Sequence, residues 1–248
     1  DHRDLHSFPT RRSSDLRQFK GFSYFTEMSD IINRLEDHVA SARMKTTPVI
    51  DFEKNESLKG LDYLDTIYHA IVNEHPIQLK YRSFKARSAN SFIFYPYLLK
   101  EYRNRWFVYG VRGNGRILQN LALDRIQSLE VLPQEHYIKN TFFDPNTFFN
   151  DLVGVTKNSG SVAEKVGFKV AAAEAPYIIT KPIHRSQQVV ERLADGSVIL
   201  EIEVVINHEL ERVFFGYAEG IQVLYPKTLV ELMGRKLKKA AEQYTHSK

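Results

Sequence analysis

The spacing of apolar residues changes abruptly at Pro76. Between residues 61 and 71 they recur at intervals of three or four, which predicts an amphipathic helix over 61–74. From Ile77 to Arg82 apolar and polar residues alternate, which predicts a half-buried strand. A chain with this change folds as a helix followed by sheet, and the continuation of the period-two pattern decides which kind of sheet.

Short strand-like segments continue to Pro133, with a Gly113-Asn114-Gly115 turn between two of them. After the first strand, we predict strands at 91–99, 105–111, 116–123 and 126–132. No helical pattern interrupts them, so parallel crossovers are not expected. The segment therefore predicts a small twisted β-barrel within a domain of residues 61–138.

Residues 139–163 are rich in Asn, Thr and Phe and then in Gly and Ser, so we predict a linker there. Residues 164–248 follow as a second domain with the order β-α-β-β-α-β and one further helix. The expected elements are a strand 166–172, a helix 173–180, a hairpin of 189–193 and 198–206, a helix from Asn207 to Gly220, a strand 221–224 and a helix after Pro226. This order predicts a ferredoxin-like unit, and the whole chain is expected to be α+β.

The first sixty residues divide into two parts. Residues 1–16 have no helical or strand period and look like a translated sequencing-library adapter; the alternative is an ordinary disordered tail. Within a linker region of residues 17–60, Ile31, Leu35 and Val39 form an apolar stripe on a helix expected over 29–42. We therefore expect the native N-terminus to be missing.

Positive charge is concentrated in one part of the chain. The net charge is +4, yet residues 76–125 contain ten Lys/Arg and two acidic residues, a local charge of +8. The same block contains ten aromatic residues. Aromatic rings among basic side chains suit base stacking combined with phosphate contacts, so an anionic partner is expected here. The alternative is a solvated basic face with most rings in the core.

Motifs for chemistry are missing from the sequence. The absence of cysteine excludes a disulfide scaffold, a thiolate zinc site and a cysteine nucleophile. His208-Glu-Leu-Glu-Arg212 begins like a zinc-protease helix but has Arg212 in place of the second histidine. No phosphate-binding loop, nucleophile elbow or membrane-length apolar run occurs. We therefore expect a cytoplasmic protein that is not an enzyme and uses no cofactor, metal or membrane.

Several short motifs occur together in a fixed order. They are Lys80-Tyr-Arg-Ser83, Phe94-Tyr-Pro-Tyr97, Trp106-Phe107-Val108, Leu123-Asp124-Arg125-Ile126, Glu209-Leu210, Phe215-Gly216-Tyr217 and Val223-Leu-Tyr-Pro226. With them the chain resembles the WYL-domain family over about residues 17–248. Phe92 and Ala122 stand where many members have arginine.

The resemblance implies the effector-sensing and dimerising part of a bacterial transcriptional regulator. An Sm- or SH3-like WYL barrel would bind a nucleotide or single-stranded nucleic acid, and the C-terminal unit would support a homodimer. A winged helix-turn-helix, missing before Arg17, would bind promoter DNA. The second reading is a free-standing barrel that binds RNA or single-stranded DNA. The third is an enzyme with an unrecognised dispersed site.

Seven residues are candidates for ligand binding. They are Tyr81, Ser83, Lys85, Arg87, Tyr95, Asn120 and Arg125. Tyr81 and Tyr95 can stack on a ring or donate a hydrogen bond from the hydroxyl. The loop residues can contact phosphate, and the Asn120 amide can hydrogen-bond to the polar edge of a ligand. Arg125 can donate two parallel hydrogen bonds to one anion. The alternatives are that Arg125 pairs with Asp124 and that Lys85 and Arg87 are solvated. Trp106 is expected in the core.

Overall fold

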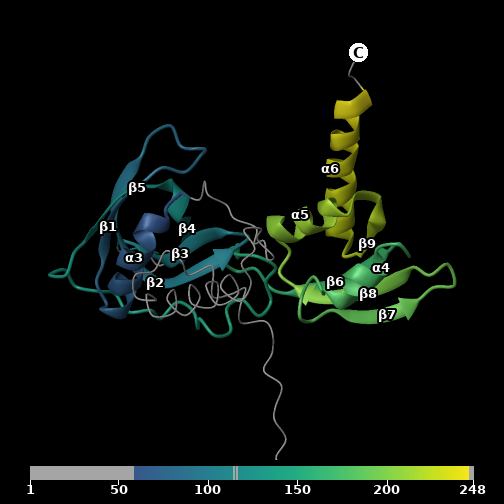
Figure 1. The fold of residues 1–248 in the computed structure, drawn as a ribbon, viewed down its shortest axis with the longest axis horizontal. Helices are drawn as coiled ribbons and strands as arrows, with labels where there is room; N and C mark the ends of the chain where they lie inside the picture. The colour runs from purple at the N-terminus through teal and green to yellow at the C-terminus, as the bar shows by residue number, and fades with distance from the viewer. Residues whose placement is uncertain (1–58, 114, 116, 246–248) are drawn as a thin grey trace, which may run out of the picture. The chain divides into compact units, whose positions relative to one another are not determined.

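A computed structural model of the chain describes residues 59–113, 115 and 117–245 (Figure 1). The chain divides into two compact units, one ending at Phe142 and one beginning at Phe143. The adapter-like segment 1–16 and the helix expected over 29–42 lie outside the described residues. Within the described part, none of the helices is both long enough and apolar enough to cross a bilayer.

The first unit contains two short helical segments followed by an antiparallel sheet. Its elements are η2 (Leu61–Tyr63), α3 (Leu64–Val72), β1 (Ile77–Tyr81), β2 (Asn90–Tyr102), β3 (Arg105–Arg112), β4 (Gln119–Ala122), η3 (Leu123–Arg125) and β5 (Ile126–Val131). The strands lie in the order β4-β3-β2-β1-β5, and all neighbours are antiparallel. The predicted change from helix to strands at Pro76 is therefore confirmed.

The closed barrel expected from the strand pattern is not confirmed. β4 and β5 are the two edges of the sheet and are not hydrogen-bonded neighbours in the part of the chain described. They are nevertheless joined by the three residues of η3. Because a 3₁₀ turn rises only about 2 Å per residue, the sheet must curve until its edges approach each other at this corner. The reason for the difference is that a turn, rather than a strand ladder, connects the edges.

One apolar core fills the inner face of this sheet. Side chains from α3, including Leu64 and Ile67, pack with Ile77 and Leu79 of β1 and with Phe94 of β2. Trp106 also belongs to this core and is 8% exposed, as expected. Tyr81 lies at the edge of the same core, so the end of β1 brings a polar aromatic group to the boundary between core and solvent.

The second unit contains a four-stranded antiparallel sheet. Its elements are β6 (Glu164–Val170), α4 (Ala175–Thr180), β7 (Gln188–Arg192), β8 (Val198–Val204), α5 (His208–Gly216), η4 (Ala218–Gly220), β9 (Ile221–Tyr225) and α6 (Lys227–Thr245). The strand order β7-β8-β6-β9 is that of two interleaved β-α-β segments, as the element order along the sequence predicted. Buried side chains of α4, α5 and the first half of α6 pack on the sheet.

Residues before β6 form part of this second unit. Leu152, Val153 and Val155 are buried. The Asn207 amide nitrogen donates to the carbonyl oxygens of Val153 and Thr156, both at 2.9 Å, while its Oδ1 caps α5. The Thr156 hydroxyl also donates to Glu209 Oε1 of α5 at 2.8 Å. The segment for which composition suggested a linker is thus held to the start of α5 by side-chain hydrogen bonds.

Only the first half of α6 belongs to that core. Leu229 and Met233 are its buried residues, whereas residues 234–245 are exposed. Figure 1 shows this helix projecting away from the sheet of its unit. Leu237 and Tyr244 continue the apolar stripe, and they are 41% and 84% exposed. The stripe therefore extends beyond anything in its own unit that covers it.

Candidate functional site

A partly open pocket of about 290 Å³ lies where the chain leaves β1 and where η3 leads into β5. Its lining consists of Arg82, Ser83, Phe84, Asp124, Arg125, Ile126 and Gln127. The backbone N–H of Arg82 donates to the carbonyl oxygen of Arg125 at 3.1 Å, and this bond extends the β1–β5 ladder past the end of β1. Two stretches far apart in sequence are thereby fixed side by side.

Arg125 covers an exposed phenylalanine in this pocket. Its guanidinium carbon lies 4.5 Å from the centre of the Phe84 ring, which is the geometry of a cation–π contact. The Phe84 side chain is 74% exposed although it is wholly apolar. A ring held this way by a guanidinium presents a flat apolar surface next to positive charge.

Asp124 is shared by two arginines. Its Oδ1 lies 3.8 Å from Arg125 Nε, which is an ion pair too long for a hydrogen bond. Its Oδ2 lies 3.3 Å from Arg105 Nε at the start of β3. The pairing of Arg125 with Asp124, one of the two possibilities raised by the sequence, is therefore present. Since Arg105 also neutralises the carboxylate, Arg125 is not balanced by a full negative charge.

Tyr81 lies next to this arginine. Burial raises the pKa of its hydroxyl, while the positive charge of Arg125 and hydrogen bonding to the backbone of Ala122 and to Arg125 oppose the rise. The phenol is therefore protonated at neutral pH. Tyr81, Ser83 and Arg125 are the three sequence candidates that the structure brings together.

The other candidates lie elsewhere. Lys85 and Arg87 are exposed in the loop that follows Phe84, outside the pocket lining. Tyr95 is opposite Val111 on the outer face of β2, and its ring contacts Tyr137 with the ring centres 6.1 Å apart. Asn120 is opposite Tyr109, also on the outer face, because its neighbour Leu121 points into the core. Tyr95 and Asn120 are therefore separated from Arg125 by the sheet.

Sequence reasoning missed Arg82, Phe84 and Asp124 as lining residues. The available signal was the loop Arg82-Ser-Phe-Lys-Ala-Arg87, in which an aromatic residue lies within a basic turn. Periodicity assigns no core position to an aromatic side chain that lies outside an alternating strand. Phe84 is such a residue, and it is exposed. The chemistry of the pocket is thus that of guanidinium donors around an aromatic surface.

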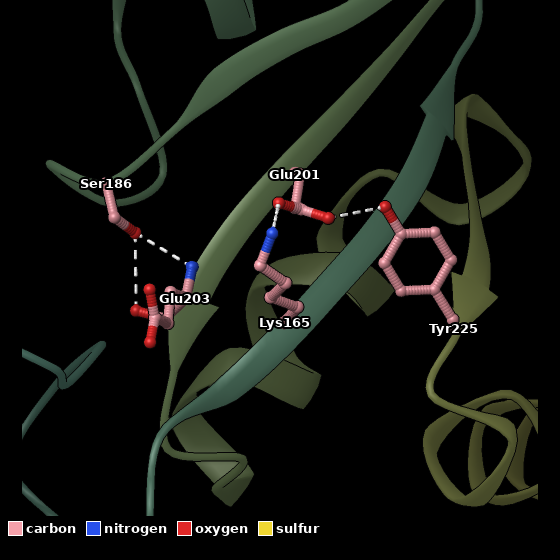
Figure 2. Close-up of polar contacts among 5 residues, drawn as sticks. All are labelled: Lys165, Ser186, Glu201, Glu203 and Tyr225. Atoms are coloured by element: carbon pink, nitrogen blue, oxygen red, sulfur yellow. Dashed lines mark hydrogen bonds and ion pairs between the residues drawn. The ribbon is translucent and has the colours of Figure 1, made fainter.

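The second unit contains a polar cluster of a different kind, shown in Figure 2. Lys165 Nζ donates to Glu201 Oε1 at 2.8 Å, and Tyr225 Oη donates to Glu201 Oε2 at 2.8 Å. The bond from Lys165 lowers the pKa of the Glu201 carboxyl. Ser186, just before β7, accepts through its Oγ from the backbone N–H of Glu203 on β8 at 2.9 Å. These contacts connect β6, β8 and β9 with one another and the segment before β7 with β8.

In the part of the chain that the structure describes, no three or more His, Asp or Glu side chains are grouped so that they could hold a metal ion.

Comparison with known families identifies both units. Residues 62–131 match the family model of the WYL domain, and residues 163–241 match that of the WCX domain. The chain belongs to the WYL-domain family. The pocket, formed by Arg82–Phe84 and Asp124–Gln127, lies within the WYL domain, and the polar cluster lies within the WCX domain.

Two solved structures show a distant likeness to this chain. The proteasome accessory factor B/C (PafBC) of Arthrobacter aurescens is 16% identical over 77% of this chain, with a TM-score of 0.31. A CRISPR Cas-related protein is 12% identical over 75% of this chain, with a TM-score of 0.45. This chain spans 28% of the first and 52% of the second. No curated protein matches it.

Proposed function

We propose that the WYL domain binds an anionic ligand with a planar base, either a nucleotide or a short single-stranded nucleic acid. The observation that carries this proposal is Arg125 stacked on the exposed Phe84 inside the pocket. Guanidinium groups bind phosphate with two parallel hydrogen bonds, and an exposed aromatic ring stacks on a base. Ligand and binding residues are therefore matched in both charge and shape.

The size of the pocket supports binding of a discrete ligand rather than a non-specific attraction of anions to a basic surface. Ligand pockets of proteins start at about 300 Å³, and this one is about 290 Å³. Arg82 and Arg125 both line it. Since Asp124 is also shared with Arg105, an incoming phosphate can draw Arg125 toward itself without leaving the carboxylate unpaired.

Ligand binding would serve regulation. Membership of the WYL-domain family supports a role as the effector-sensing and dimerising part of a bacterial transcriptional regulator in the cytoplasm, with promoter DNA bound by a further domain. The Sm-like character of the barrel is part of this proposal. A non-catalytic role is proposed as well. A free-standing nucleic-acid-binding protein would bind single strands in the same pocket but would control no promoter.

The stripe on α6 supports a homodimer through the WCX domain. Leu237 and Tyr244 are exposed on a helix whose last turns contact no core, and isolated helical turns are marginal in water. Sedimentation of the protein at micromolar concentration is expected to give a dimer mass. The Tyr244→Lys variant is expected to shift the equilibrium toward monomer, and a wild-type monomer would reject the dimer.

Binding is tested by titration with a mononucleotide (AMP) and with a fluorescent oligothymidylate of about ten nucleotides, at several salt concentrations. We expect affinity that falls with salt, because bound phosphates release counterions. Arg125→Ala should weaken binding of both probes and make it less dependent on salt. Lys139→Ala is the control, since Lys139 pairs with Glu74 before β1, away from the pocket. No binding of either probe at low salt would overturn the proposal.

A further inference from the structure

Two further pairs of arginine and an aromatic ring occur in the WYL domain. One, Arg103 with Tyr102, lies at the turn between β2 and β3; the other is formed by Arg112. The guanidinium carbon of Arg112, at the end of β3, lies 4.1 Å from the centre of the Phe92 ring on β2. Arg112 is exposed. Among the described residues no carboxylate forms an ion pair with it, in contrast to Arg105 and Arg125, which share Asp124. Its charge is thus available to a ligand.

Strand register places this pair beside the pocket. Phe92 is opposite Leu79, and Tyr81 is opposite Asn90. Tyr81 and Phe92 are therefore diagonal neighbours on one face of β1 and β2, about 7–8 Å apart. Both pack at the edge of the same core. Arg112 is opposite Phe94, which points to that face as well.

These positions form a continuous path along one end of the sheet. It runs from Phe84 to Arg125 through their stacking contact, from Arg125 to Tyr81, from Tyr81 to Phe92 by register, and from Phe92 to Arg112. The path contains three aromatic rings and two guanidinium groups, with an arginine–phenylalanine pair at each end. A mononucleotide carries one base and one phosphate-bearing group, so it can occupy only one of the two pairs.

We propose that Phe92 and Arg112 form a second subsite, and that the ligand is a short single strand of at least two nucleotides rather than a mononucleotide. This inference rests on the proposed function of the pocket. Arg125 and Phe84 hold one nucleotide, and Arg112 holds the phosphate of the next with Phe92 supporting its guanidinium. A strand contacting both pairs bridges β3 to the pocket across β2 and β1.

The test compares AMP with the oligothymidylate of about ten nucleotides on three variants. Arg112→Ala should leave the affinity for AMP unchanged and weaken binding of the strand several-fold. For single strands each phosphate contact contributes about 0.7 to the slope of log affinity against log salt, so this variant should lower the slope by about that amount. Arg112→Lys should keep the slope but lose part of the affinity, because lysine keeps charge and loses the planar contact. Lys139→Ala should behave as the wild type.

The outcomes separate this inference from the function it rests on. If the wild type binds neither probe, the proposed function fails. If it binds both with equal affinity and Arg112→Ala changes neither, the second subsite is wrong while the pocket stands. If Arg112→Ala weakens AMP and the strand equally, Arg112 belongs to the first subsite and the two-subsite assignment is wrong. Unchanged emission of Trp106, which is buried in the same domain, shows that each variant is folded.

Discussion

The aromatic ring of Tyr225 lies directly against the backbone of Gly167. A Cβ atom built on Gly167 would be 2.1 Å from Cζ of the tyrosine, far inside van der Waals contact. The two residues are cross-strand partners on β9 and β6. Glycine is therefore required here by close approach, and the ring it admits carries the hydroxyl that binds Glu201.

Gly167→Ala is expected to destabilise the WCX domain by about 1–3 kcal/mol, the usual cost of overpacking. The new methyl group must displace the Tyr225 ring and with it the hydrogen bond to Glu201. Urea unfolding followed by far-UV circular dichroism measures the effect. In a Tyr225→Ala background the same substitution should cost much less, because the obstructing ring is gone.

A matched control exists on α6. Nothing lies within 4 Å of a Cβ built on Gly234, and glycine inside a helix is less stable than alanine by about 0.5–1 kcal/mol. Gly234→Ala should therefore stabilise the protein. Equal effects of the two glycine substitutions would contradict the steric explanation.

Asn207→Asp tests how residues 153–156 are held. Aspartate keeps the acceptor that caps α5 through Leu210 N–H, but it has no amide to donate to Val153 and Thr156. We expect a loss of about 1–3 kcal/mol, because two carbonyl groups lose their donor next to a carboxylate. The midpoint of urea unfolding measures it. A variant as stable as the wild type would mean that helix capping is the only role of Asn207.

We expect His184 to make the stability of the WCX domain depend on pH. Burial, together with the charge of Arg185, lowers the pKa of the imidazole below its usual value near 6.5. The unfolded state then binds more protons than the folded state. The contribution of His184 to the free energy of unfolding is therefore complete above about pH 6.5 and is lost as the pH falls through the pKa of His184 in the folded protein. The free energy of unfolding should be smaller at about pH 5.5 than at about pH 7.5.

The matched variants are His184→Gln and His136→Gln, since the second histidine is exposed in the other unit. His184→Gln should flatten the pH dependence in this range, whereas His136→Gln should retain it. An unchanged pH slope in His184→Gln would assign the dependence to another group.

Phe84→Ala should separate stacking from charge. The side chain is 74% exposed, so the free energy of unfolding should change by no more than about 0.5 kcal/mol. Affinity for a base-bearing ligand should fall by about 1–3 kcal/mol, with the salt slope unchanged. Titration with AMP at two salt concentrations checks both. Tyr177→Ala removes another exposed aromatic ring, in the second unit, and should leave binding intact.

Periodicity predicted the elements well where one face is buried. β1 alternates as expected, and β8 follows the predicted strand closely because Leu200 and Ile202 point into the core. Boundaries differ where tertiary contacts decide them. The expected strand 116–123 is reduced to β4 and η3, since its last residues turn toward β5. Alternation cannot show whether the edges of a sheet pair or are joined by a turn.

The candidate site was predicted only in part. Tyr81 and Arg125 were predicted because a phenol can stack or donate and a guanidinium can bind an anion, and the two residues do meet. Tyr95 was assigned to the same site, yet it lies on the outer face of β2 beside Tyr137. Register between strands determines which residues share a face, and a single sequence does not contain it. Phe84 was missed because it lies in a loop, where no alternation of apolar and polar residues indicates which side chains are exposed.

The backbone bond from Arg82 to the carbonyl of Arg125 has a consequence for how the pocket can respond. It joins the two segments that form the pocket walls, and the β1–β5 ladder continues directly from it. The walls cannot separate without breaking this ladder. Ligands of different size must therefore be accommodated by rotation of the Arg82, Phe84 and Arg125 side chains within a rigid frame, so selectivity here is a matter of rotamers rather than of loop opening.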